Sequence, residues 1–117
     1  MLYGHKAGDL ILRALGQLLR TQTRPNDVAC RYGGEEFVVI MPDAPLEVAV
    51  VRADEVRQAF ADLEVRYGST SLSATITIGG ATFPYHGTDS ETLLHAADQA
   101  LYAAKSAGRD LVYAAGA

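Results

Sequence analysis

The pair Gly33-Gly34 constrains the fold of this chain most strongly, because it lies between two runs of strand-forming residues. One run covers residues 28–32 and the other covers residues 35–41. Two such runs around a glycine pair are typical of a β-hairpin with a primed two-residue turn. The second run is largely apolar, so we expect a central strand that is buried on both faces.

Apolar side chains at helical spacing predict three further elements, all amphipathic helices, over residues 9–22, about 45–63 and about 89–107. Asp9 stands where an N-cap or a first-turn acid belongs in the first of them. Thr88 and Glu91 have the spacing of a capping box at the start of the third. Gly108 follows its end, where a C′ glycine is expected.

Alternating apolar and polar side chains predict a long strand over residues 71–83, and residues 111–113 form a short closing strand. Gly79-Gly80 within the long strand indicates a bulge or a close backbone approach. The resulting order, helix–strand–strand–helix–strand–helix–strand, predicts one α+β domain with helices packed on an antiparallel or mixed sheet, which we expect to be mostly antiparallel.

Length, charge and cysteine usage narrow the functional class. A chain of 117 residues is long enough for one hydrophobic core. The net charge of −4 argues against general binding to a nucleic acid polymer. No apolar run reaches the roughly 20 residues that span a bilayer, so we expect no membrane contact by this domain. The lone Cys30 is expected to be a buried, inert thiol in a cytoplasmic protein.

The segment Gly33-Gly34-Glu35-Glu36 is the strongest candidate for chemistry. Glycines let backbone approach a ligand closely, and carboxylates can hold Mg²⁺ beside phosphate oxygens. In a strand the two glutamates would point to opposite faces, so we expect one to face the site and the other to pair with a surface cation. The structural alternative is an ordinary hairpin with solvated acids, which composition alone favours.

Further charged residues have two readings each. Lys105 and Arg109 either complement the dipole at a helix C-terminus or clamp a terminal phosphate group. Arg24 and Asp27 form either an exposed ion pair or a site for a phosphate and a guanine edge. Asp9 is either a helix cap or an acid that reads a base. Spacing alone leaves these alternatives open.

The sequence resembles the GGDEF family of diguanylate cyclase domains over essentially the whole chain. Three words carry the resemblance in the family's order and spacing, namely Tyr3-Gly4-His5-Lys6-Ala7-Gly8-Asp9, Arg31-Tyr32-Gly33-Gly34-Glu35-Glu36-Phe37, and the segment 97–109. The resemblance implies an α+β sandwich of the polymerase-palm or ferredoxin-like type. Glu-Glu in place of Asp-Glu is the usual active variant of the signature.

The resemblance also implies an activity and its partners. Such domains condense two GTP molecules into cyclic di-GMP and two pyrophosphates. Each protomer holds one GTP, two protomers meet face to face as a homodimer, and two Mg²⁺ ions per active site assist the attack of a ribose 3′-hydroxyl on an α-phosphate. A regulatory sensory domain is expected in the parent protein.

Site roles follow from the resemblance by position. At the active site it implies a metal ligand and candidate base at Glu35, a supporting acid at Glu36, backbone against ribose and phosphate at Gly33 and Gly34, a guanine acceptor at Asp9, and outer-phosphate contacts at Lys105 and Arg109. It implies a product-inhibition site for cyclic di-GMP at Arg24 and Asp27, five residues before the glycine pair, with Arg57 as a second arginine.

The chain departs from the family pattern at its start. Family members carry an earlier strand with an aspartate ligand, a Phe-Lys pair and a guanine-reading Asn, and none of these precedes Met1. We therefore expect the fold without its first strand, and little or no cyclase activity from this chain as given. The alternatives are a non-catalytic module that binds cyclic di-GMP and a dimerisation domain that binds no nucleotide.

Overall fold

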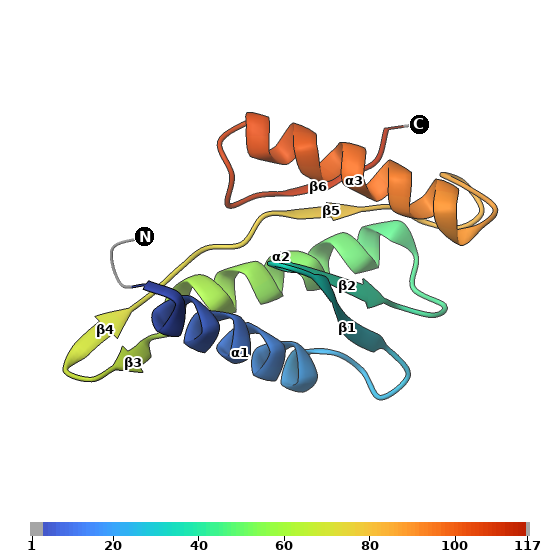
Figure 1. Cartoon of the computed structure of the whole chain (residues 1–117). Coiled ribbons are helices and arrows are strands. Elements are labelled where there is room, and N and C mark those ends of the chain that lie inside the picture. The colour runs from blue at the N-terminus through green and yellow to red at the C-terminus, as the bar shows by residue number, and fades with distance from the viewer. Residues whose placement is uncertain (1–3, 117) are drawn as a thin grey trace. The chain divides into compact units, whose positions relative to one another are not determined.

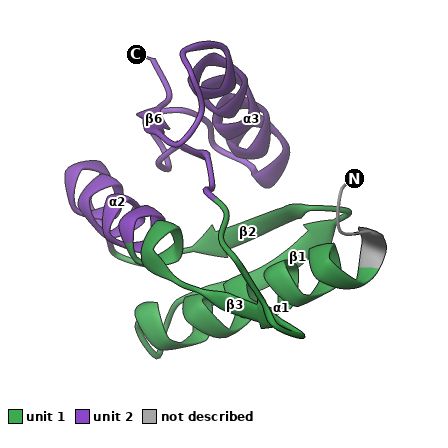
Figure 2. Ribbon diagram, turned by 90° about the vertical axis from the view of Figure 1, so that its left-hand side faces the viewer, with its two compact units in different colours: residues 1–43, 59–74 green, residues 44–58, 75–117 purple. Residues whose placement is uncertain are grey.

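The computed structural model describes residues 4–116 and contains two compact units. Figure 2 shows the first unit, residues 1–43 and 59–74, in green and the second, residues 44–58 and 75–117, in purple. The elements follow along the chain (Figure 1) as α1 (Gly4–Gln22), β1 (Val28–Gly33), β2 (Glu36–Ile40), α2 (Leu46–Asp62), β3 (Val65–Tyr67), β4 (Thr70–Leu72), β5 (Ile78–Gly80), α3 (Ser90–Ser106) and β6 (Val112–Ala114).

The strands within residues 4–116 pair two by two. β1 pairs with β2 and β3 pairs with β4, both antiparallel, whereas β5 and β6 are parallel. Parallel pairing requires a crossover, and α3 supplies it. The α+β class and the predominance of antiparallel pairs agree with the prediction.

Helix α1 begins at Gly4, five residues before the predicted start at Asp9. Its buried face continues toward the N-terminus through Ala7, which is 2% exposed, in line with the buried Leu15 and Leu19. This burial favours the helix over the low helix propensity of Gly8. Asp9 is therefore an exposed residue inside the helix, and the prediction that it caps or opens the helix is wrong.

The predicted hairpin forms between β1 and β2, with its loop one residue later than expected. Gly33 pairs with Glu36, so Gly34 and Glu35 form the two-residue loop. The register shifts just before Gly33, which indicates a bulge that the sequence pattern did not predict. Gly34 has φ +51°, a conformation that favours glycine at the first position of a primed turn.

Two burial predictions for this hairpin are wrong. The residues at the centre of β2 are half-buried and Ile40 is 56% exposed. Within residues 4–116, β2 pairs with β1 along one edge and with no strand along the other, so it is not a central strand. All of β1 is exposed, and Cys30 with it, so this thiol is not buried. An apolar run identifies a strand here without identifying its neighbours.

The predicted strand over residues 71–83 is divided. A short hairpin turns at Gly68, which has φ +62°, and joins β3 to β4; the sequence pattern did not predict β3. Residues 73–77 have no strand partner within the described chain, although Leu72 is buried and Ser73 is exposed as the alternation predicts. Alternation thus predicts which side chains are buried, whereas a strand also needs a partner.

In the second unit, β5 approaches α3 closely at Gly79. A Cβ atom there would collide with the backbone carbonyl of Ala97 and lie 2.8 Å from the Cα of Leu101. α3 packs on β5 and β6 and buries Ala100 and Ala104. The close backbone approach predicted at Gly79-Gly80 is therefore confirmed at Gly79.

The caps of α3 differ from the prediction at one end only. Asp89, not Thr88, is the N-cap, and it accepts a 2.8 Å hydrogen bond from the backbone N–H of Thr92 in a capping box that does not use Glu91. This bond lowers the pKa of Asp89. Asp and Thr have similar preferences for the N-cap position, so the sequence pattern locates the N-cap only to within one residue. At the other end Ala107 is the C-cap and Gly108 follows it as C′, as predicted.

Replacing Gly79 by alanine is expected to destabilise the protein by about 1–3 kcal/mol, because the new methyl group overpacks a contact between backbones. The matched control is Gly80→Ala, since no atom lies within 4 Å of a Cβ at Gly80. That control should stay within about 0.5 kcal/mol of the parent. Urea unfolding monitored by circular dichroism measures both values, and equal midpoints would contradict the close approach.

Candidate active site

The glycine turn of the β1–β2 hairpin is open and held by an arginine. Arg31 donates from Nε and Nη2 to the carbonyl oxygen of Gly34, at 3.0 and 2.6 Å. No atom lies within 4 Å of a Cβ built on Gly33 or Gly34. A ligand can therefore approach this backbone, while Arg31 fixes its conformation. Sequence reasoning gave Arg31 no role, although its spacing of three residues from Gly34 is a usable signal.

The two glutamates lie at this turn. Glu35 is in the loop and Glu36 is the first residue of β2, and both are exposed. Neither makes an ion pair within residues 4–116, so the predicted pairing of one of them with a surface cation is not seen. The predicted alternation across a strand does not apply, because Glu35 belongs to the loop. Both carboxylates are available to a ligand.

The oxygen donors at the turn suit magnesium. Among the described residues there is no group of three or more His, Cys, Asp or Glu side chains that could hold a metal ion. Mg²⁺, however, is usually bound by one or two carboxylates and takes its other ligands from phosphates and water. The exposed carboxylates of Glu35 and Glu36 are therefore of the ligand type that Mg²⁺ accepts together with a phosphorylated ligand.

The remaining predicted contacts are divided between the two units. Asp9 belongs to the first unit, as does the glycine turn, and it is exposed on α1. Lys105 and Arg109 belong to the second unit, exposed at the C-terminal end of α3. Neither cation has an ion pair among residues 4–116, so both are free to bind an anion.

The turn that carries Arg24 and Asp27 is tightly bonded. Asp27 accepts from the backbone N–H of Arg24 at 2.8 Å and from the guanidinium at 3.0 and 3.2 Å. Arg24 also donates to the carbonyl oxygen of Pro42 at 2.8 Å. The Asp27 side chain is fully shielded, whereas that of Arg24 is 35% exposed. This pair is more ordered than an exposed ion pair, and Arg24 is the member that a ligand can contact.

A cavity of about 430 Å³ adjoins this turn, and its lining residues are Arg24, Pro25, Asn26, Pro42 and Asp43. The guanidinium of Arg24 is the cation in that lining. A volume of this size is in the range of small-molecule sites.

Arg57 is engaged by two acids within the second unit. It donates from Nε to Asp54 at 2.7 Å and from Nη1 to Asp110 at 2.8 Å. The hydrogen bond from Arg57 lowers the pKa of Asp54, and the bonds to Asp54 and Asp110 raise the pKa of Arg57. Two carboxylates and one guanidinium carry a net charge of −1. The sequence analysis missed Asp110, which lies 53 residues from Arg57.

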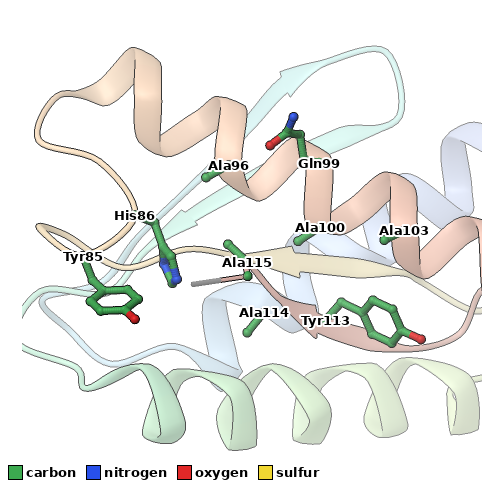
Figure 3. A pocket seen from close by; sticks show the side chains of 10 residues that line it. Tyr85, His86, Ala96, Gln99, Ala100, Ala103, Tyr113, Ala114 and Ala115 are labelled. Atoms are coloured by element: carbon green, nitrogen blue, oxygen red, sulfur yellow. The ribbon is translucent and has the colours of Figure 1, made fainter.

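A second cavity, of about 450 Å³, lies in the second unit beside α3 and β6 (Figure 3). Alanines of α3 form part of its wall, and Tyr85, His86, Gln99 and Tyr113 supply larger side chains. None of the predicted site residues lines this cavity.

Comparison with known sequences identifies the family. The family model described as "Diguanylate cyclase, GGDEF domain" matches residues 1–111. The response regulator PleD of Caulobacter vibrioides is 41% identical over 112 residues, and diguanylate cyclase A of Treponema denticola is 33% identical over 110 residues. Each match covers 94% of this chain, but it covers only 25% of PleD and 30% of the Treponema protein.

Solved structures share the fold. The GGDEF domain of DgcB from Caulobacter crescentus, crystallised with c-di-GMP, superposes with a TM-score of 0.88 at 32% identity over 99% of this chain and 67% of that one. The active GGEEF domain of a diguanylate cyclase from Vibrio cholerae gives 0.86 at 27% identity over 99% and 73%. The predicted α+β, palm-like fold is thereby confirmed. No helix within residues 4–116 is long and apolar enough to cross a membrane.

The family match extends over nearly the whole chain, and it includes the glycine turn with its two glutamates. The chain therefore belongs to the GGDEF family of diguanylate cyclase domains.

Proposed function

We propose that this chain is part of a diguanylate cyclase, an enzyme that condenses two GTP molecules into cyclic di-GMP and two pyrophosphates. The observation that carries the proposal is the open turn at Gly33 and Gly34. It presents uncovered backbone beside two carboxylates that make no ion pair with any described residue. Carboxylate oxygens beside uncovered glycine backbone suit a nucleoside triphosphate with its magnesium. The family membership supplies the reaction class.

The residues divide the work by chemistry. Glu35 would hold Mg²⁺, which when bound neutralises phosphate charge and lowers the pKa of the attacking hydroxyl, and Glu36 would be the supporting acid beside it. The backbone of the turn lies against ribose and phosphate. Asp9 accepts from the N–H groups of guanine. The protein thus contributes mainly position and charge.

The reaction forms one bond and breaks another at each phosphorus. A ribose 3′-oxygen of one GTP attacks the α-phosphorus of the other, the hydroxyl proton is lost to a base for which Glu35 is the candidate, and pyrophosphate leaves. A second attack of the same kind, by the remaining 3′-oxygen on the remaining α-phosphorus, releases the second pyrophosphate and closes the ring. Lys105 and Arg109 neutralise charge on the departing phosphates, which makes pyrophosphate a better leaving group.

Two GTP molecules must meet for this reaction, and one glycine turn serves one of them. We therefore propose a homodimer in which each protomer presents one GTP. A regulatory sensory domain in the parent protein is part of the same proposal, because the chain spans only a quarter to a third of the relatives described above.

A specific observation also favours product binding at a second place. The exposed guanidinium of Arg24, held by the shielded Asp27, lines a cavity of about 430 Å³. A fixed, partly exposed arginine is well suited to a phosphodiester or a guanine edge. We propose that cyclic di-GMP binds there as an inhibitor, with Asp27 orienting Arg24. Arg57, which belongs to the second unit, is proposed as a further arginine that binds the product.

Substituting Glu35 by glutamine is expected to weaken Mg²⁺-dependent GTP binding by about tenfold or more, because an amide is a poor ligand for a hard cation. Calorimetry with GTP, with and without Mg²⁺, measures the effect, and chromatographic detection of cyclic di-GMP measures turnover. Glu64→Gln, at another exposed glutamate, is the matched control. Equal losses in the two variants, or none in either, would contradict the assignment of Glu35.

Substituting Arg24 by alanine is expected to weaken the binding of cyclic di-GMP by about tenfold or more, since charge-assisted hydrogen bonds are lost. The control is Arg20→Ala, which removes an exposed arginine from the last turn of α1. Titration calorimetry with cyclic di-GMP gives both affinities, and a thermal melt shows that each variant is folded. Identical heats for Arg24→Ala and the parent would eliminate this site.

A further inference from the structure

The chain that follows α3 has a constrained backbone at the position of a proposed phosphate ligand. Arg109 has φ +62° and Asp110 has φ +54°, so two successive residues other than glycine lie in the left-handed region. Such residues persist only where surrounding contacts fix them. Because Arg109 is exposed, burial of its own side chain does not hold its backbone in this conformation, and other contacts must do so.

Contacts to Asp110 fix this turn from two sides. Its backbone N–H donates to the hydroxyl of Thr77 at 3.0 Å, and its carboxylate accepts from Arg57 at 2.8 Å. The N–H of Arg109 donates to the carbonyl oxygen of Ala104 in the last turn of α3, also at 3.0 Å. The backbone of Arg109 is thus tied both to α3 and, through Asp110, to segments distant in the sequence.

Arg57 is itself held in place. Asp54 accepts from its Nε at 2.7 Å and from Nε2 of Gln58 at 2.6 Å, and only 20% of the Arg57 side chain is exposed. The hydrogen bonds from Arg57 and Gln58 lower the pKa of Asp54. The Arg57 guanidinium is bonded to two carboxylates whose side chains are 41% and 42% exposed, so it belongs to a network and is not an isolated ion pair.

We propose that Arg57 and Asp110 are positioning residues that fix the backbone of Arg109, so that its exposed side chain is oriented toward the outer phosphates of GTP. This inference rests on the proposed function and adds to it the contacts that prepare the phosphate-binding end of α3. A side chain that leaves a fixed backbone loses less entropy when it binds than one on a mobile loop.

Neutralising Asp110 changes the affinity for an anion in opposite directions according to whether Asp110 acts through its charge or by positioning Arg109, so the direction of the change distinguishes the two roles. If Asp110 acted only through its negative charge near Arg109, Asp110→Asn would strengthen the binding of an anion. If Asp110 positions Arg109, the same change weakens it, because the amide is a weaker partner for Arg57. Asparagine also tolerates the left-handed backbone, so the substitution does not itself strain the turn.

The experiment compares the affinities of GTP and GMP, both with Mg²⁺, in the full chain by titration calorimetry. GMP lacks the outer phosphates and serves as the reference ligand. Positioning predicts about a tenfold loss of GTP affinity with GMP affinity unchanged in Asp110→Asn, and a similar loss in Arg57→Lys, which keeps the charge and loses the planar fork. Asp62→Asn, at an exposed acid at the end of α2, should leave both affinities unchanged.

Amide hydrogen exchange supplies a readout that does not depend on nucleotide. Exchange at Arg109 and Asp110 should accelerate in Asp110→Asn while the helical amides of α3 stay protected. Unchanged exchange at these amides, or unchanged or tighter GTP binding by Asp110→Asn, overturns the positioning role. A parent chain that binds no GTP while the exchange result holds contradicts the proposed function instead.

Discussion

The contact between bare backbones at Gly79 is the constraint on which the second unit depends. Because no side chain separates β5 from α3 there, the helix lies closer to the strand than any other residue would permit. Ala100 and Ala104 are small enough to be buried at that distance. The same helix ends at Ser106 and carries Lys105 in its last turn. In the first unit the backbone of Gly34 is not packed against another element, and a ligand can approach it.

Features encoded by a few neighbouring residues could be predicted from the sequence. The glycine hairpin, three amphipathic helices and the C′ residue Gly108 all follow from local patterns, and all are present. Errors of one residue occurred where two neighbours compete for one position, as Thr88 and Asp89 do at a helix cap. The bulge before Gly33 displaced the loop in the same way, because a turn sequence does not reveal a change of register.

Features that depend on distant segments could not be predicted. The start of α1 depends on what buries Ala7, and the division of the expected long strand depends on the absence of a strand partner for residues 73–77 within the described chain. For the candidate site, the motif identified Glu35 and Glu36, and the structure adds that neither makes an ion pair within residues 4–116. The bond between Arg57 and Asp110 joins residues that no local pattern connects.

The double engagement of Arg57 has a thermodynamic consequence. If cyclic di-GMP contacts this guanidinium, its phosphates approach a positive charge that two carboxylates already outweigh. The ligand is then repelled unless one of the carboxylates moves away from Arg57. Withdrawal of Asp110 would release the segment that bears Arg109. Occupancy by the dinucleotide and order at the end of α3 would then be antagonistic, and linkage requires each to oppose the other by the same factor. An enzyme built in this way would sense its own product through competition for a single arginine.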